Sequence, residues 1–172
     1  EARDLNERFI VGITRRRPYV HLKLAQSRDG FITHAAGEER RITGREANAL
    51  VHRWRASHDA VLVGAGTIRA DDPALTVRYA AGRHPAVVVL DGRLTVPPDA
   101  RLFKSTRDRQ VYVVTGSRRK RTGKVRRLLE QKGVGIIELP GPRGRVPLQR
   151  VLEELYRRQI GSLLVEGGAQ VA

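Results

Sequence analysis

Short apolar runs alternate with amphipathic segments along most of the chain. Runs that alternate apolar and polar residues, or that stay apolar for several residues, predict strands. These runs lie at residues 19–25, 60–63, 86–90, 111–114, 134–139 and 162–165. Between them, apolar residues at helical spacing predict helices that begin near residue 43 and cover residues 124–132 and 148–158.

The first predicted helix carries the clearest start signal. Thr43 and Glu46 have the spacing of a capping box, in which a hydroxyl and a carboxylate satisfy backbone N–H groups at the helix start. Each predicted helix also has an apolar face that is expected to point toward a core. The residues predicted to face inward are Ala47, Leu50, Val51 and Trp54 in the first helix, Val125, Leu128 and Leu129 in the second, and Val151, Leu152 and Leu155 in the third.

Strands that alternate with helices indicate an α/β domain with a largely parallel sheet flanked by helices. Such sheets bind ligands at the carboxyl ends of their strands. The positions that follow predicted strands are therefore the candidates for a site: Asp29, residues 64–72, Asp91, Gly92, residues 115–117 and residues 166–168. Residues 1–17 are interpreted as a lead-in outside the core.

Composition narrows the class of protein. A length of 172 residues suits one globular domain of ordinary size. The absence of cysteine excludes a disulfide framework, a thiolate metal site and a cysteine nucleophile. No apolar run reaches the roughly 18–20 residues that a membrane span needs, and the charged N-terminal residues lack the apolar stretch of a signal peptide. We therefore expect a cytoplasmic protein with no membrane partner.

The charge of the chain is strongly positive. Lys and Arg number 33 against 18 Asp and Glu, which gives +15. This balance favours either a polyanionic partner or an anionic small molecule. The basic cluster at residues 118–127 has two interpretations. It either binds nucleic acid or forms a solvated loop and helix face. No aromatic residue lies inside the cluster to stack on bases, so the solvated surface is the favoured interpretation.

Glycines follow two of the predicted strands. Residues 64–67 read Gly-Ala-Gly-Thr, which suits either a phosphate close to the backbone or a tight turn, since Arg69 replaces the third glycine of the dinucleotide fingerprint. After the last strand, Glu166 precedes Gly167 and Gly168, which resembles the start of an anion-binding turn. Glu166 would be costly to bury without a partner that neutralises it.

The segment DDPALTVR at residues 71–78 has two interpretations. It is either a turn that ends a helix or a loop in which Asp and Thr67 bind ligand hydroxyls while Arg78 binds a phosphate. Arg55, near the end of the first predicted helix, is expected on its own to stabilise the helix dipole. The five histidines show no metal-ligand spacing and are interpreted as structural or surface residues, so no metal site is predicted.

In order and spacing, these motifs resemble one family, the reductase domain of the bifunctional riboflavin-biosynthesis deaminase–reductase. The resemblance rests on RPYVHLKLAQSRDG at residues 17–30, ITG at 42–44, RA at 55–56, DAVLVG at 59–64, DDPALTVR at 71–78 and EGG at 166–168. It spans roughly residues 17–172. Residues 1–16 resemble the end of that family's deaminase domain.

The resemblance implies a dihydrofolate-reductase-like α/β fold and an NADPH-dependent reduction of 5-amino-6-(5-phosphoribosylamino)uracil, a phosphorylated pyrimidine. In that reaction the ribosyl ring opens to a carbonyl or imine form, hydride adds at C1, and the ribitylamino product feeds riboflavin synthesis. The implied substrate-binding residues are Arg55, Leu75, Arg78 and Glu166. The implied cofactor-binding residues are Ala25, Thr67, Asp71, Gly167, Gly168 and Ala169. The implied catalytic residues are Lys23, Asp29 and Glu166, with Lys23 as the candidate proton donor.

The chain departs from the family pattern at three positions. Glu39 stands where the family often has a serine that meets the substrate, and Arg41 replaces a tryptophan that packs on the cofactor. Gly92 stands where the family can have a serine near the cofactor. Because of these departures, a related reductase that acts on another pterin or pyrimidine substrate is one alternative function. A non-catalytic basic relative that binds nucleic acid is the alternative from a different class.

The resemblance also implies a domain organisation. The family's domain continues beyond the EGG turn with a helix and further strands, so we expect residues 17–172 to form a reductase domain that is truncated at its C-terminus. Residues 1–16 are expected to be a linker or the end of a preceding deaminase domain. The cysteines of the zinc deaminase signature are absent, so this segment is not expected to deaminate. A homo-oligomer, in the form of a dimer, is the expected assembly.

Overall fold

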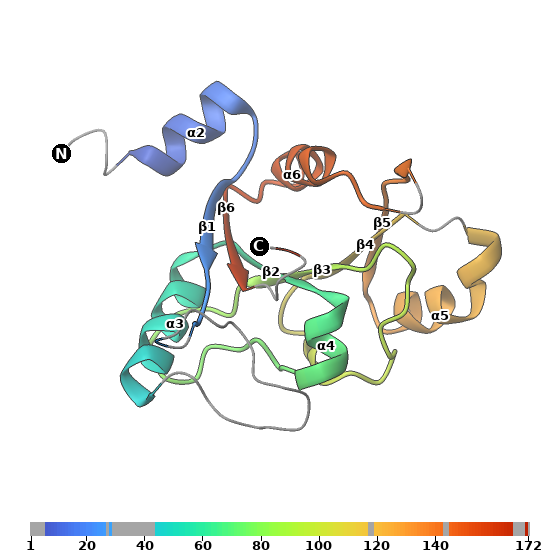
Figure 1. The fold of residues 1–172 in the computed structure, drawn as a ribbon, viewed down its shortest axis with the longest axis horizontal. Coiled ribbons are helices and arrows are strands. Elements are labelled where there is room, and N and C mark those ends of the chain that lie inside the picture. The colour runs from blue at the N-terminus through green and yellow to red at the C-terminus, as the bar shows by residue number, and fades with distance from the viewer. Residues whose placement is uncertain are drawn as a thin grey trace.

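The computed structural model describes residues 6–26, 28, 44–116, 119–142, 145–166 and 171. Within them, six parallel strands form one sheet: β1 (Tyr19–Lys23), β2 (Ala60–Gly64), β3 (Ala86–Leu90), β4 (Val111–Thr115), β5 (Gly135–Glu138) and β6 (Ser162–Glu166). The helices are α2 (Glu7–Arg15), α3 (Arg45–Ser57), α4 (Ala65–Asp71), the 3₁₀ helix η1 (Arg101–Ser105), α5 (Arg119–Gln131) and α6 (Leu148–Arg157). Helices α3, α4 and α5 cover one face of the sheet, and α6 lies over the other (Figure 1). The predicted α/β class with a parallel sheet is confirmed.

The strand order is β1-β6-β2-β3-β4-β5, so the last strand lies between the first two. The side chain of Asp59, just before β2, fixes this insertion. Its Oδ2 accepts hydrogen bonds from the amides of Gly161 and Ser162, at 3.1 and 2.9 Å. The carboxyl ends of β1, β6 and β2 therefore lie side by side, at the edge where ligands bind in open parallel sheets.

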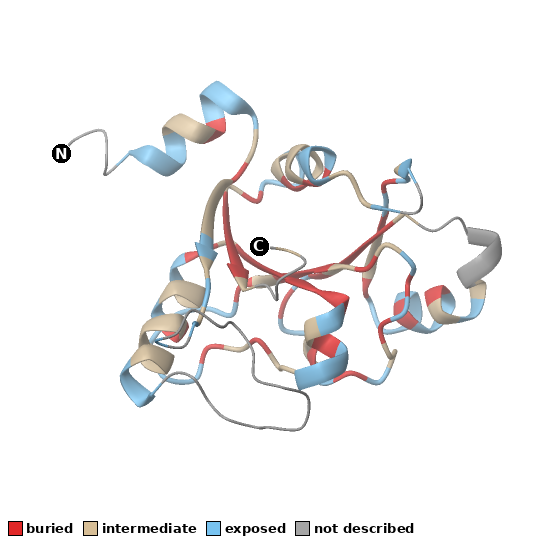
Figure 2. Cartoon of the chain, viewed as in Figure 1, coloured by how far each residue is buried: buried red, intermediate tan, exposed pale blue. Residues whose placement is uncertain are grey.

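Two apolar cores fill the space on either side of the sheet. Successive residues of a strand point to opposite faces, so the unbroken apolar runs of the central strands supply both cores. Val61, Val87 and Val113 pack toward the α3–α5 side. Leu62, Val88 and Val114 pack toward α6. Figure 2 shows these central strands as the most continuously buried part of the chain.

The lead-in segment contains helix α2, which the sequence analysis did not predict. Gly12 of α2 is buried, and a Cβ at that position would lie 3.3 Å from the ring of Tyr156 in α6, so the glycine permits this close approach. Arg8 Nη1 donates a hydrogen bond to the Ser57 carbonyl at the end of α3, at 2.5 Å. Helix α2 is thus attached to the sheet domain at α6 and at the end of α3, but no described residue of this segment belongs to either core, and Phe9 and Ile13 are exposed.

Three local predictions concern short segments. The capping box predicted for α3 depends on Thr43, which lies outside the described residues; α3 itself begins at Arg45, with Gly44 at the N-cap position. Gly64 ends β2 and directly precedes α4, so residues 64–67 form a strand-to-helix junction. Leu128 is 39% exposed rather than buried, because α5 turns it away from the core that Leu129 enters.

Candidate functional site

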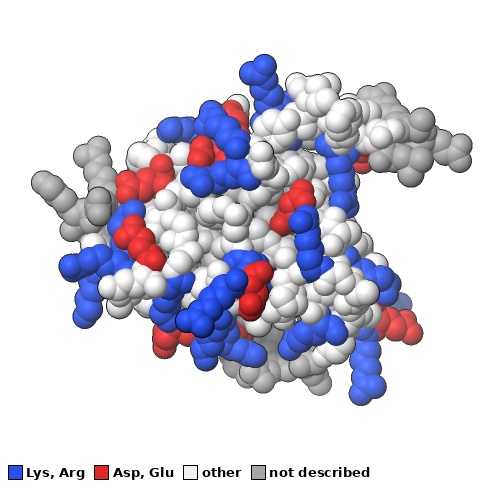
Figure 3. Space-filling view, turned by 180° about the vertical axis from the view of Figure 1, so that it is seen from behind, with Lys and Arg blue, Asp and Glu red and all other residues white. Residues whose placement is uncertain are grey.

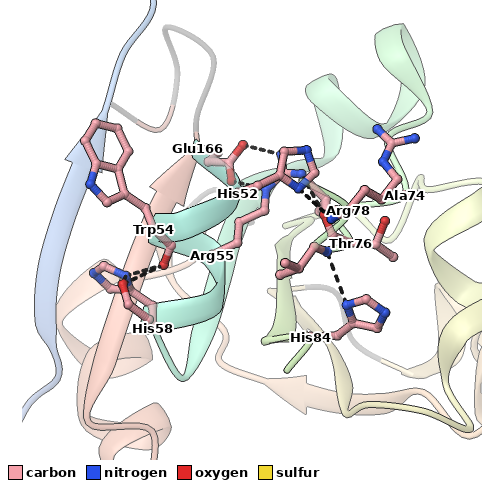
Figure 4. Close-up of polar contacts among 12 residues, drawn as sticks. His52, Trp54, Arg55, His58, Ala74, Thr76, Arg78, His84 and Glu166 are labelled. Atoms are coloured by element: carbon pink, nitrogen blue, oxygen red, sulfur yellow. Dashed lines mark hydrogen bonds and ion pairs between the residues drawn. The ribbon is translucent and has the colours of Figure 1, made fainter. Parts of the chain in front are cut away.

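An ion pair joins α3 to the end of β6 at the carboxyl edge of the sheet (Figure 4). Arg55 Nε donates to Glu166 Oε1 at 2.6 Å, and Arg55 Nη2 donates to Oε2 at 2.7 Å. Only 12% of the Arg55 side chain and 11% of the Glu166 side chain are exposed. The bidentate geometry offsets part of the cost of removing both charges from water. The partner that a buried Glu166 requires is therefore Arg55, which does more than stabilise a helix dipole.

Lys23 lies on the strand next to this ion pair. It ends β1, and its partner in the parallel register of β1 and β6 is Glu166. Paired residues on neighbouring strands project from the same face of a sheet, so the Lys23 and Glu166 side chains lie on the α3 side. Each Glu166 oxygen has a second lone pair that remains able to accept a ligand hydroxyl or N–H. The edge thus combines a hydrogen-bond acceptor with a half-buried ammonium group.

The loop that carries Arg78 is held by side chains rather than by its own backbone. Among the described residues, no backbone–backbone hydrogen bond involves residues 73–85. Instead, side chains of α3, the side chain of Arg109 and that of His84 in the loop itself bond to five backbone groups of residues 74–78. They are the carbonyls of Ala74, Leu75 and Thr76 and the amides of Val77 and Arg78.

Two arginines bind the three carbonyls. Arg55 Nη1 donates to the Thr76 carbonyl at 3.1 Å, so the same guanidinium holds both Glu166 and the loop. Arg109, between η1 and β4, donates to the carbonyl of Leu75 at 2.5 Å and to the carbonyl of Ala74. Burial, with a smaller contribution from Arg55, lowers the pKa of Arg109 to about 10. Arg109 could not be predicted from the sequence, because no motif distinguishes it from the other arginines.

Two histidines bind the two amides. His52 Nδ1 accepts from the Arg78 amide at 2.9 Å, and His84 Nδ1 accepts from the Val77 amide at 3.1 Å. Each Nδ1 must be unprotonated to accept, which assigns the ring hydrogen of the neutral imidazole to Nε2. The prediction that the histidines are structural is confirmed for these two. Their role in this loop could not be recognised from the sequence.

Arg78 and Leu75 face different surroundings within this loop. Arg78 is exposed, with its guanidinium carbon 5.7 Å from the centre of the Tyr79 ring. Leu75 has φ of 51° and is 4% exposed, so its side chain belongs to the core. A leucine rarely adopts this left-handed backbone, and such conformations persist only where the surroundings hold them. Leu75 therefore shapes the loop, and Arg78 presents a cation from it.

The two adjacent aspartates after α4 have different partners. Asp72 takes a left-handed backbone at the helix end, and its Oδ1 accepts from the Arg101 amide at 2.8 Å. Asp71 is exposed on the last turn of α4. The helix-ending interpretation thus describes Asp72, while Asp71 is accessible to a ligand. Asp91 is also structural, because its buried Oδ2 accepts from two loop amides, those of Thr95 and Val96.

The positions expected to bind a cofactor lie along the same edge. Ala25 follows β1, while Thr67 and Asp71 are one turn apart on the same side of α4. Gly66 directly precedes Thr67, and a Cβ built on it would meet no described residue within 4 Å, so the first turn of α4 is open there. A hydroxyl, a carboxylate and open backbone suit the ribose hydroxyls and amide of a nicotinamide nucleotide. Asp29, Gly167, Gly168, Ala169, Glu39 and Arg41 lie outside the described residues.

Acidification is expected to destabilise the protein through His52 and His58. Burial lowers the pKa of both imidazoles below 6.5, and the nearby Arg55 and Arg78 add to this effect at His52, as Arg8 does at His58. The unfolded chain therefore takes up these protons first as the pH falls through about 6.5. The free energy of unfolding is expected to fall with pH below that value, by at most about 1.4 kcal/mol per pH unit for each histidine.

Urea unfolding of the wild type between about pH 7.5 and about pH 5 measures this loss. The double variant His52→Gln, His58→Gln removes both groups and is expected to flatten the pH dependence. A double variant that loses as much stability on acidification as the wild type would show that other groups are responsible.

The chain also matches known proteins over most of its length. The family model of the RibD C-terminal domain matches residues 18–172. The chain is 37% identical over 169 residues to the riboflavin biosynthesis protein RibD of Aquifex aeolicus, which aligns 98% of this chain with 45% of that protein. It is 39% identical over 162 residues to the 2,5-diamino-6-ribosylamino-4(3H)-pyrimidinone 5′-phosphate reductase of Archaeoglobus fulgidus, with 88% of this chain and 71% of that protein aligned.

Solved structures with the same fold include two larger proteins. A diaminohydroxyphosphoribosylaminopyrimidine deaminase/5-amino-6-(5-phosphoribosylamino)uracil reductase from Thermotoga maritima superposes with a TM-score of 0.78 at 35% identity, over 98% of this chain and 44% of that one. RibD from Acinetobacter baumannii superposes with a TM-score of 0.80 at 33% identity, over 99% and 45% of the two chains. This chain spans about half the length of the RibD proteins that it matches. The parallel α/β sheet, the ordered motifs and the match over residues 18–172 together show that the chain belongs to the RibD C-terminal domain family.

Proposed function

We propose that this protein is an NADPH-dependent reductase of riboflavin biosynthesis that converts 5-amino-6-(5-phosphoribosylamino)uracil to its ribitylamino product. The observation that carries the proposal is the group formed by Lys23, Arg55 and Glu166 at the ligand-binding edge of the sheet, beside the loop that presents Arg78. A basic loop suits the substrate phosphate, and an oriented carboxylate suits the ribityl hydroxyls or a pyrimidine N–H.

Four residues take part in substrate binding, two by contact and two by positioning the others. Arg78 binds the phosphate as an exposed cation, and Leu75 gives the loop the shape that presents it. Glu166 accepts a hydrogen bond from the substrate with the lone pairs that Arg55 leaves available. Arg55 fixes the orientation of that carboxylate through two hydrogen bonds. The Glu166 carboxylate is thus already oriented before the substrate arrives, which lowers the entropic cost of binding.

The reduction needs a hydride at C1 of the opened ribosyl group and a proton at the atom bonded to C1. The nicotinamide cofactor, when bound, supplies the hydride. Ala25, Thr67 and Asp71 hold the nucleotide in this proposal, together with Gly167, Gly168 and Ala169. Lys23 supplies the proton from the α3 side of the sheet, and Asp29 completes the catalytic set carried over from the family.

Reductase activity is expected with one of two pyrimidines. NADPH absorbance should fall when the purified protein receives 5-amino-6-(5-phosphoribosylamino)uracil, and mass spectrometry should find a product that has gained two hydrogens. The 2,5-diamino-6-ribosylamino-4(3H)-pyrimidinone 5′-phosphate substrate, for which the Archaeoglobus relative is named, is the second arm. A larger kcat/KM with this second compound would assign the protein to the pyrimidinone phosphate reductases. If neither compound caused oxidation of NADPH, the proposed function would be wrong.

The net charge of +15 does not by itself indicate nucleic-acid binding. On the face shown in Figure 3, Lys and Arg side chains are interspersed with Asp and Glu instead of forming one continuous basic patch. No helix in the described part of the chain is long and apolar enough to cross a membrane. A reductase domain at residues 17–172, a deaminase-derived segment at residues 1–16, a cytoplasmic location and a homodimer remain predictions.

A further inference from the structure

Arg109 is a buried cation that bonds only to neutral oxygens among its described hydrogen bonds. The residue is 7% exposed. Nε donates to Ser105 Oγ at 2.9 Å, Nη1 donates to the Leu75 carbonyl, and Nη2 donates to the Ala74 carbonyl. Burial of a guanidinium without a carboxylate partner is costly, because only hydrogen bonds replace the lost hydration. An apolar residue would fill this position at lower cost, so the cation needs another explanation.

The carbonyls that Arg109 binds belong to the most constrained point of the loop. Leu75 adopts φ of 51°, and no backbone–backbone hydrogen bond from another described residue supports residues 73–85. A leucine in this conformation costs on the order of 1–3 kcal/mol unless its surroundings hold it. The guanidinium donates two charge-assisted hydrogen bonds, one to the Ala74 carbonyl and one to the Leu75 carbonyl. It thereby holds the two peptide groups that flank the Leu75 α-carbon.

This constraint extends toward Arg78, three residues further along the chain. The intervening Thr76 carbonyl is bound by Arg55, and the Arg78 amide is bound by His52, so both lie against α3. Arg109 holds the opposite end of the same short segment against η1. The segment is therefore fixed at both ends, and the direction in which Arg78 leaves the loop depends on both attachments.

We propose that Arg109 is a positioning residue for the substrate: through the carbonyls of Ala74 and Leu75, it sets the place from which Arg78 meets the substrate phosphate. The proposal rests on the proposed reductase function for its kinetic consequence. Arg109 lies beneath the loop and does not touch the substrate. Its loss should therefore weaken the binding of the phosphorylated substrate and leave the binding of NADPH unchanged.

Steady-state kinetics of Arg109→Met and Arg109→Lys test this role. In Arg109→Met, KM for the phosphorylated pyrimidine is expected to rise about 10- to 100-fold, while kcat and KM for NADPH change by less than about threefold. Arg109→Lys should be intermediate, because an ammonium reaches one or both carbonyls without the planar fork. Arg107→Met, an exposed arginine two residues away, is the matched control and should behave as the wild type.

A purely structural role would give a different pattern. Equal weakening of NADPH and substrate binding in folded Arg109→Met would overturn the proposal, and so would an unchanged substrate KM in that variant. If Arg109→Met does not fold, Ser105→Ala takes its place. This variant removes the acceptor of Arg109 Nε and should raise the substrate KM by about 2- to 5-fold, as expected for the loss of one hydrogen bond. No rise in Ser105→Ala would then overturn the proposal.

Amide hydrogen exchange separates this proposal from the proposed function. In Arg109→Lys, the Val77 and Arg78 amides should exchange about tenfold faster than in the wild type, while the β3 amides keep their wild-type rates. This measurement needs no substrate. A wild type without reductase activity would end the proposed function alone, whereas unchanged exchange at Val77 and Arg78 would overturn the role of Arg109 alone.

Discussion

Replacing Glu166 with glutamine is expected to lower kcat/KM for the phosphorylated pyrimidine by about 10²- to 10³-fold, the largest loss for any single binding group of the site. The carboxylate that accepts from the substrate becomes an amide, and its NH₂ group faces the guanidinium of Arg55, which also donates. Arg55 is then a buried cation without its ion-pair partner. The free energy of unfolding should fall by about 3 kcal/mol, as for other buried pairs that lose one member.

Turnover assays and urea unfolding of Glu166→Gln measure the two effects separately. Glu154→Gln is the control, since Glu154 pairs with the more exposed Arg157 and Arg158 at the end of α6, and its replacement should change stability by less than about 1 kcal/mol. In a double-mutant cycle, Arg55→Met combined with Glu166→Gln should destabilise less than the sum of the two single changes. Near-wild-type turnover in folded Glu166→Gln would contradict the proposed role of the carboxylate.

Replacing Lys23 with methionine is expected to lower kcat by about 10²- to 10⁴-fold, the range for losing a general acid. Methionine keeps the aliphatic part of the side chain, so β1 should remain packed against β6 and the protein should stay folded. The binding of NADPH should be close to that of the wild type, because the cofactor contacts proposed at Thr67 and Asp71 are unchanged. Single-turnover rates at saturating substrate measure the loss without interference from product release.

Arginine at the same position distinguishes proton donation from charge. Lys23→Arg keeps the positive charge, but a guanidinium is a much weaker acid than an ammonium and does not readily give up a proton. This variant should therefore bind substrate and remain nearly as slow as Lys23→Met. Recovery of most of the wild-type kcat would show that Lys23 acts through its charge alone. Lys124→Met, an exposed lysine on α5, controls for the loss of one cation.

Predictions from local pattern succeeded where burial is decided by a few neighbouring residues. The apolar runs at residues 60–63, 86–90 and 111–114 became β2, β3 and β4, because a strand covered on both faces leaves an unbroken apolar signature. Helix α2 was missed because its contacts are few: a glycine approaches Tyr156, and Arg8 reaches the end of α3. Phe9 and Ile13, one turn apart on this helix, are exposed, so the apolar spacing of the segment does not mark a face that enters the core.

The sequence predicted where the candidate site lies better than it predicted the hydrogen bonds and ion pairs among the site residues. Parallel strands place their carboxyl ends at one edge, so residues after strands could be named as candidates without knowing the strand order. A buried glutamate needs a partner, and the sequence indicated that need at Glu166. The family resemblance supplied Lys23, Arg55 and Arg78 as residues of one site. It did not indicate that Arg55 would also hold the Thr76 carbonyl.

By itself, the sequence determined the types of the main elements, the α/β class and the edge of the sheet at which chemistry is expected. The tertiary structure decided that β6 lies between β1 and β2, that Glu166 pairs with an arginine 111 positions away, and that Arg109 supports Leu75 from 34 positions away. The reason is physical. Helix and strand formation depends on residues within a few positions of one another, whereas these contacts exist only after the chain crossings have brought distant segments together.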